Sequence, residues 1–107
     1  MSEVVSQFWA EAERLGDGAA ELRQEPNGYT ELLIPTSAGT LEISGEGEFV
    51  SVACGHLFIE DHRLASREDG DFLLAVCDAV LAGRAEVARP RVKAELLTRG
   101  HSEIWTA

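Results

Sequence analysis

The stretch SVACGHLFIEDH, residues 51–62, contains a cysteine, two histidines and an acidic pair. A thiol beside an imidazole can act as a nucleophile with its base, and thiolate, imidazole and carboxylate groups are the ligands that zinc uses in proteins. Either chemistry requires these side chains to lie within hydrogen-bonding or coordination distance of one another. The elements that carry the stretch therefore decide whether it is a site or a strand with polar residues.

An extended strand rises about 3.3 Å per residue, which separates Cys54 from His62 by ~26 Å and prevents one metal ion from binding both. Cys54 and His56 share a strand face, but tetrahedral zinc needs further ligands, and the only other histidine is His101. The chain has no CxxC, HxH or HExxH motif. We therefore expect no metal and no other cofactor, and we expect Cys54 to be a small buried core residue. A thiol enzyme or hydrolase using Cys54 and His56 stays open as an alternative.

Two amphipathic helices are predicted around the stretch. In residues 2–16 apolar side chains recur at spacings of three and four, with Ser2 and Gly16 suited to the two ends. The second helix, residues 71–83, has an unbroken apolar stripe, with Asp69 or Asp71 as its cap and Gly83 after its end. The first helix should pack through these residues: Val4, Val5, Phe8, Trp9, Ala12 and Leu15. The stripe of the second helix should cover a sheet.

Between the two helices the apolar period changes to two, which is typical of β-strands. Asn27–Gly28 readily supplies the positive φ angles of a tight hairpin turn, and Gly55 favours a bulge or bend within one long strand. Residues 61–70 are polar and indicate a loop, with Leu64 packing on the core. The expected strands are residues 19–25, 29–37, 40–44 and 49–60.

The whole chain of 107 residues is predicted to be one α+β domain, residues 1–107, with enough surface to bury one core. Its expected order is an N-terminal helix, an antiparallel β-meander, an amphipathic helix packed on the sheet and a C-terminal strand pair. Residues 90–107 also fit a helix that begins at Pro90, and we prefer the two strands.

The charge balance restricts the class of partner. Nine basic and nineteen acidic residues give a net charge of −10, and residues 1–62 hold all of this excess. Such a charge disfavours nucleic acid and anionic membranes and favours a basic protein. The N-terminal residues do not resemble a secretory signal, and no apolar run approaches the length of about 20 residues needed to cross a bilayer. We expect a cytoplasmic protein with both cysteines reduced.

Strand alternation concentrates the acidic residues on one face of the predicted sheet. If the apolar residues of the strands point inward, the glutamates between them point outward, and others lie at the adjacent turn. The predicted partner-binding residues are Glu31, Glu42, Glu46, Glu48, Glu60 and Asp61. An ordinary solvated face is the alternative for any one of them, but their clustering favours a basic protein partner, whose approach they would accelerate. The basic residues after position 83 are interleaved with glutamates and indicate a balanced solvent face, or a surface that pairs with a second copy.

The run TLEISGEGEFVSVACGHLFIED, followed by DFLLAVCDAVLAGRAEV, resembles small immunity proteins that accompany polymorphic toxins in actinobacteria. In those proteins a strand pair of the form Leu-x-Ile/Val and Val-x-Val-x-x-Gly precedes a helix that ends near Leu-Ala-Gly-Arg. The resemblance covers residues 40–90 and carries over no functional residues. It implies a non-enzymatic cytoplasmic protein that binds and inhibits a cognate toxin domain. A chaperone-like adaptor for a secreted protein, which would form a homodimer, is a further alternative.

Overall fold

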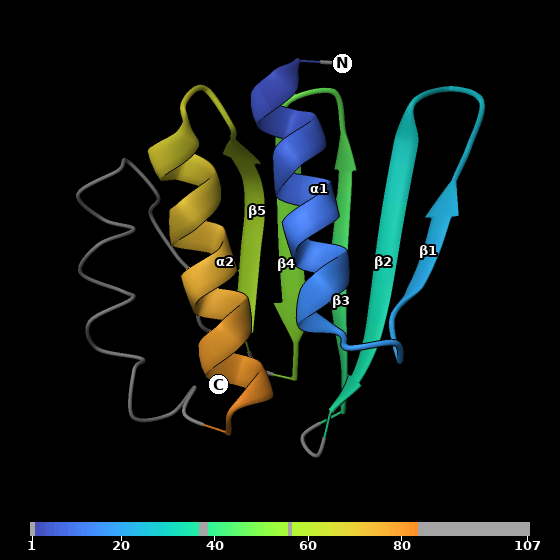
Figure 1. Ribbon diagram of the computed structural model, residues 1–107, viewed down its shortest axis with the longest axis vertical. Helices are drawn as coiled ribbons and strands as arrows, with labels where there is room; N and C mark the ends of the chain where they lie inside the picture. The colour runs from blue at the N-terminus through green and yellow to red at the C-terminus, as the bar shows by residue number, and fades with distance from the viewer. Residues whose placement is uncertain (1, 37–38, 56, 84–107) are drawn as a thin grey trace.

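The computed structural model describes residues 2–36, 39–55 and 57–83. Their five strands form one antiparallel sheet in chain order, and both helices cover the same face of that sheet (Figure 1). The elements are helix α1 (Glu3–Leu15), strands β1 (Glu21–Gln24), β2 (Tyr29–Thr36), β3 (Gly39–Glu46), β4 (Phe49–Cys54) and β5 (Leu57–Arg63), and helix α2 (Arg67–Leu81). The predicted α+β class, with a meander between two helices, is confirmed. The predicted C-terminal strand pair lies outside the described residues.

Helix α1 packs on the sheet through the face that its periodicity predicts. Its start is capped by Ser2, whose Oγ accepts a hydrogen bond from the Val5 N–H at 3.2 Å. Trp9 lies over Gly45 of β3, where a Cβ atom would come within 3.1 Å of the Trp9 ring and 2.7 Å of the Phe49 carbonyl oxygen. The absence of a side chain at Gly45 therefore lets the indole approach the sheet. The buried residues of the helix are Val5, Phe8, Trp9 and Ala12.

The hairpin between β1 and β2 has the predicted tight turn, but only Gly28 has the positive φ angle, at 90°. Asn27 keeps a negative φ and instead accepts a hydrogen bond from the Tyr29 N–H on its Oδ1, at 3.0 Å. The expectation that both residues supply positive φ is wrong, because the Asn27 side chain stabilises the turn without a left-handed backbone.

Helix α2 begins earlier than the sequence pattern predicts. Ser66 is its N-cap, and Asp69 accepts hydrogen bonds on Oδ2 from the N–H groups of Ala65 and Ser66, each at 2.9 Å. The predicted loop over residues 61–70 is therefore wrong at both ends, since β5 continues to Arg63 and the helix starts at Arg67. The first turn of α2 has no apolar periodicity, so the sequence pattern does not reveal it. The hydrogen bonds to the Asp69 carboxylate stabilise this polar turn instead.

One hydrophobic core fills the space between the helices and the sheet. Arg67 joins the two helices at the surface, through an ion pair to Glu11 of α1 at 3.2 Å. Leu64 is 2% exposed, which confirms its predicted packing role. Strands β2 to β5 contribute alternate residues to the core: Leu32, Ile34, Leu41, Ile43, Val50, Val52, Cys54, Leu57 and Ile59. Helix α2 contributes Leu73, Val76, Cys77 and Val80.

Candidate functional site

The stretch from Ser51 to His62 is a hairpin rather than one bent strand. Strands β4 and β5 are antiparallel neighbours, Cys54 pairs with Leu57, and Gly55 has a φ of 58° between them. The expected meander of four strands is therefore one of five. A glycine in the middle of an apolar run can mark a chain reversal as well as a bend, and local periodicity does not separate the two.

The hairpin does not bring the chemistry-bearing side chains together. His62 pairs with Val50, four residues from Cys54 along β4, which corresponds to ~13 Å at the usual rise of a strand. The His62 side chain is 3% exposed and packs against the Phe72 ring, with centroids 5.6 Å apart. The expectation that His62 ends the strand in water is wrong, because a bulge returns it to the core side of β5. His56 lies outside the described residues.

Both cysteines are buried free thiols, and the expected core position of Cys54 is confirmed. Cys54 lies 4.0 Å from the Thr36 hydroxyl. Burial, with smaller contributions from Cys54 and Asp78, raises the pKa of the Cys77 thiol to about 12. At neutral pH Cys77 is therefore a protonated apolar residue. Residues 2–36, 39–55 and 57–83 contain no group of three or more histidine, cysteine or acidic side chains that could hold a metal ion.

The side of the sheet away from both helices, here called the outer face, carries five of the six predicted acidic residues, and the sixth, Glu48, lies in the adjacent β3–β4 turn. None of the described helices or strands covers it (Figure 1). Register places most of its side chains in three rows across the strands, and Pro35 with Thr40 forms a short fourth row. The first row is Tyr29, Glu46, Phe49 and Arg63; the second is Arg23, Glu31, Ser44, Ser51 and the bulged pair Glu60 and Asp61; the third is Glu21, Leu33, Glu42, Ala53 and Phe58.

Two of the six predicted acidic residues are engaged within the protein. Glu31 lies 3.6 Å from Arg23 and accepts a hydrogen bond from the Tyr29 hydroxyl at 3.2 Å. Glu48, in the β3–β4 turn, lies 2.9 Å from Arg63. Both pairs are at the surface, where an ion pair contributes little to stability, but each places a positive charge beside the carboxylate that a partner would meet.

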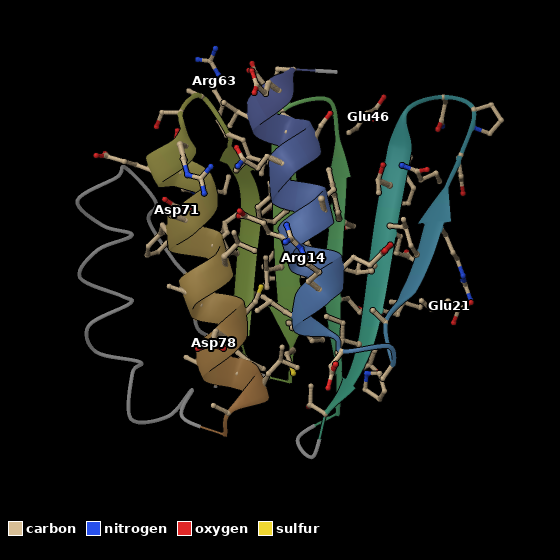
Figure 2. All side chains as sticks on the ribbon, in the orientation of Figure 1. Arg14, Glu21, Glu46, Arg63, Asp71 and Asp78 are labelled. Carbon is tan, nitrogen blue, oxygen red and sulfur yellow. The ribbon has the colours of Figure 1, made fainter. Side chains whose placement is uncertain are left out.

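The other four acidic residues, Glu42, Glu46, Glu60 and Asp61, are exposed and form no ion pair with another described residue. The bulge between Val50 and Val52 explains why two consecutive residues of β5 are both exposed. Figure 2 shows Glu46 and Arg63 at the same end of the sheet, and Glu21 on its far edge strand. The acidity of the outer face thus comes mainly from β3 and β5.

A hollow of about 480 Å³ opens on the outer face between the first two rows. It forms because Ser44 and Ser51 have short side chains between larger neighbours of both rows. Its lining is Tyr29, Ser44, Gly45, Glu46, Phe49, Ser51 and Asp61. Of these residues, the sequence pattern singled out only the two carboxylates. Two serines on the polar face of neighbouring strands were the available signal, but their proximity depends on register.

Exposed apolar side chains accompany the acids. Phe49 and Phe58 are 46% and 42% exposed and lie in the first and third rows of the outer face. Leu22, on the helix side of edge strand β1, is 38% exposed. Aromatic residues among charged ones on an open face are typical of protein-binding surfaces.

Comparisons with protein-family models, with curated proteins and with solved structures found no match to this chain. Within the described part of the chain, no helix has both the length and the apolar character needed to span a bilayer.

Proposed function

We propose that this protein is a non-enzymatic binding module that captures a basic protein through the outer face of its sheet. The observation that carries the proposal is the combination, on one uncovered face, of four exposed carboxylates without a described ion-pair partner and two exposed phenylalanine rings. The carboxylates would attract and orient a basic surface, and the rings would supply apolar contact area once it docks.

In its particular form, the proposal is that the protein is a cytoplasmic immunity protein and that its partner is a cognate toxin domain. The resemblance of residues 40–90 to such proteins supports this form, and so does the net charge of −10, because a toxin domain that acts on nucleic acid needs a basic surface. Binding over the basic surface of the toxin would exclude its substrate.

The first experiment is a tagged pull-down of the full chain from its native host, with the neighbouring open reading frames co-expressed and the retained proteins identified by mass spectrometry. A basic toxin-like domain held at one-to-one, and inactive in the complex, supports the proposal. Retention of a secreted protein by a dimer of this chain would favour the chaperone-like adaptor instead.

A charge-reversal pair then tests the binding face. Glu42→Lys with Glu60→Lys changes the outer face, and Glu13→Lys with Asp78→Lys makes the same change of net charge on the helix layer. We expect the outer-face variant to associate with the partner about tenfold more slowly at low salt and with a weaker salt dependence. The helix-layer variant should keep most of the wild-type rate. Equal effects of the two variants would mean that only the total charge affects the association rate, and would reject the outer face as the binding surface.

The chaperone-like alternative requires a stable homodimer, and the exposed Phe49 and Phe58 rings are the observation in its favour. Pairing two copies through their outer faces would bring the carboxylates of β3 and β5 against one another, which opposes that arrangement. Light scattering after size-exclusion chromatography distinguishes a homodimer, which the chaperone-like adaptor requires, from a monomer. A dimer that persists in Glu42→Lys with Glu60→Lys would not depend on this face.

The thiol-enzyme alternative has a simple test. Cys54→Ala would abolish function if Cys54 were a nucleophile, whereas a binding module would lose only core stability. The 8% exposure of Cys54 and its separation from His62 support the second outcome.

A further inference from the structure

The hollow on the outer face has a specific chemical character. Besides Gly45, its lining consists of two serines, two aromatic residues and two acidic residues. A volume of about 480 Å³ lies in the range of about 300–1,000 Å³ that holds small ligands, so one long side chain fits with water around it. The hollow therefore differs from the rest of the acidic face by offering depth as well as charge.

The negative charge of the hollow is not cancelled within the described part of the chain. Its two carboxylates, Glu46 and Asp61, form no ion pair with another described residue. The two arginines of the outer face are engaged elsewhere: Arg63 lies 2.9 Å from Glu48, and Arg23 contacts Glu21 and Glu31. A cation entering the hollow would thus meet carboxylates that no described cation already holds.

Backbone geometry fixes the position of one carboxylate. Asp61 occupies the bulge of β5 with a φ of 48°, and its N–H donates to the Ser51 hydroxyl at 3.0 Å. The bulge directs the Asp61 side chain to the outer face together with Glu60, although the two are consecutive. Without the bulge, Asp61 would point to the core side of β5, and the hollow would have only the Glu46 carboxylate.

The aromatic rings favour a flat cation. Tyr29 donates its hydroxyl to Glu31 at 3.2 Å, which restrains its ring, and Phe49 is 46% exposed. A guanidinium group can stack on an aromatic face while its N–H groups bond to carboxylates, whereas an ammonium group is compact, strongly hydrated and cannot stack.

We propose that the hollow formed by Tyr29, Ser44, Glu46, Phe49, Ser51 and Asp61 receives an arginine side chain of the basic partner. Arginine would be anchored by the two carboxylates and flanked by the two rings, with the serine hydroxyls available to water or to the guanidinium. This inference rests on the proposed function, because it names the partner group that the outer face recognises.

The test uses three small probes on the ¹⁵N-labelled full chain at low ionic strength: N-acetyl-arginine amide, N-acetyl-lysine amide and the neutral isostere N-acetyl-citrulline amide. We expect saturable shifts of the N–H resonances of Ser44, Glu46, Ser51 and Asp61 with the arginine probe, and weaker binding of the other two. Equal saturation by the lysine probe, or shifts that never saturate, would overturn the inference.

A matched pair of variants separates the hollow from the acidic face as a whole. Glu46→Gln with Asp61→Asn and Glu42→Gln with Glu60→Gln remove the same charge from the same face, but only the first pair lines the hollow. We expect the first pair to weaken arginine binding on the order of tenfold and the second by less than about twofold. Equal weakening would overturn the hollow as a site. If partner capture in the pull-down nevertheless depended on Glu42 and Glu60, the proposed function would stand, and only the arginine site in the hollow would be rejected.

Discussion

The same chemical change at two glycines should have opposite effects on stability. Gly45 lies on β3 beneath Trp9, and an added Cβ would come within 2.7 Å of the Phe49 carbonyl oxygen and 3.1 Å of the Trp9 ring. Gly70 lies in α2, and an added Cβ there would be 3.6 Å from the nearest atom of Phe8, an ordinary contact. The backbone at Gly45 cannot move without displacing a paired strand, whereas the α2 site accepts a methyl group as it stands.

We expect Gly45→Ala to lower the free energy of unfolding by about 1–3 kcal/mol, the usual cost of overpacking a core. Gly70→Ala should raise it by about 0.5–1 kcal/mol, because alanine restricts the unfolded chain and favours the helix. For a domain of this size each kcal/mol corresponds to roughly 4–8 °C in Tm. Urea unfolding of both variants, followed by far-UV circular dichroism, measures the two changes.

The m-values of the variants should equal that of the wild type, so that the difference in midpoint reports stability alone. A Gly45→Ala variant as stable as the wild type would show that α1 does not seat Trp9 on β3 in this way. A loss of stability in Gly70→Ala comparable to that of Gly45→Ala would refute the packing between α1 and α2.

Three further predictions concern titratable groups. Cys77 and Cys54 should react with iodoacetamide at pH 7 only as fast as the protein unfolds, because both thiols are buried and a pKa of about 12 leaves almost no Cys77 thiolate. Reaction of native Cys54 at the rate of an exposed thiol would contradict this prediction. Burial would raise the pKa of Asp69, but the hydrogen bonds from the N–H groups of Ser66 and Ala65 and from the Ser66 hydroxyl, together with the nearby His62, outweigh it and hold the pKa below the ordinary 3.8. Asp69→Ala should therefore cost about 1 kcal/mol at pH 7, and the difference from wild type in urea unfolding should persist down to about pH 4 and shrink as the pH falls further through the folded-state value. Arg63→Ala, which removes the exposed pair with Glu48, should change stability by less than about 1 kcal/mol, and a larger loss in the same assay would mean that the pair is more than a surface contact.

The sequence alone determined that two amphipathic helices flank a set of strands, which face of each helix is buried and, away from the bulge in β5, which strand residues point outward. These properties depend on spacings of two, three or four residues, so they can be read from neighbouring letters. The apolar face of α1, the cap at Ser2, the inward Leu41 and Ile43 and the exposed Glu42 were all accessible in this way. The charge excess and the absence of a known metal motif were likewise properties of the chain itself.

Only the tertiary structure decided how these elements meet. Gly55 ends one strand and begins the next, and that reversal, with the bulge at Asp61, buries His62 and exposes two consecutive acids. Register between distant segments determines that Glu31 and Glu48 have arginine partners while Glu46 and Asp61 line a hollow above two serines. Strand alternation fixes which face a residue takes, but its neighbours on that face come from other strands, and no local spacing encodes them.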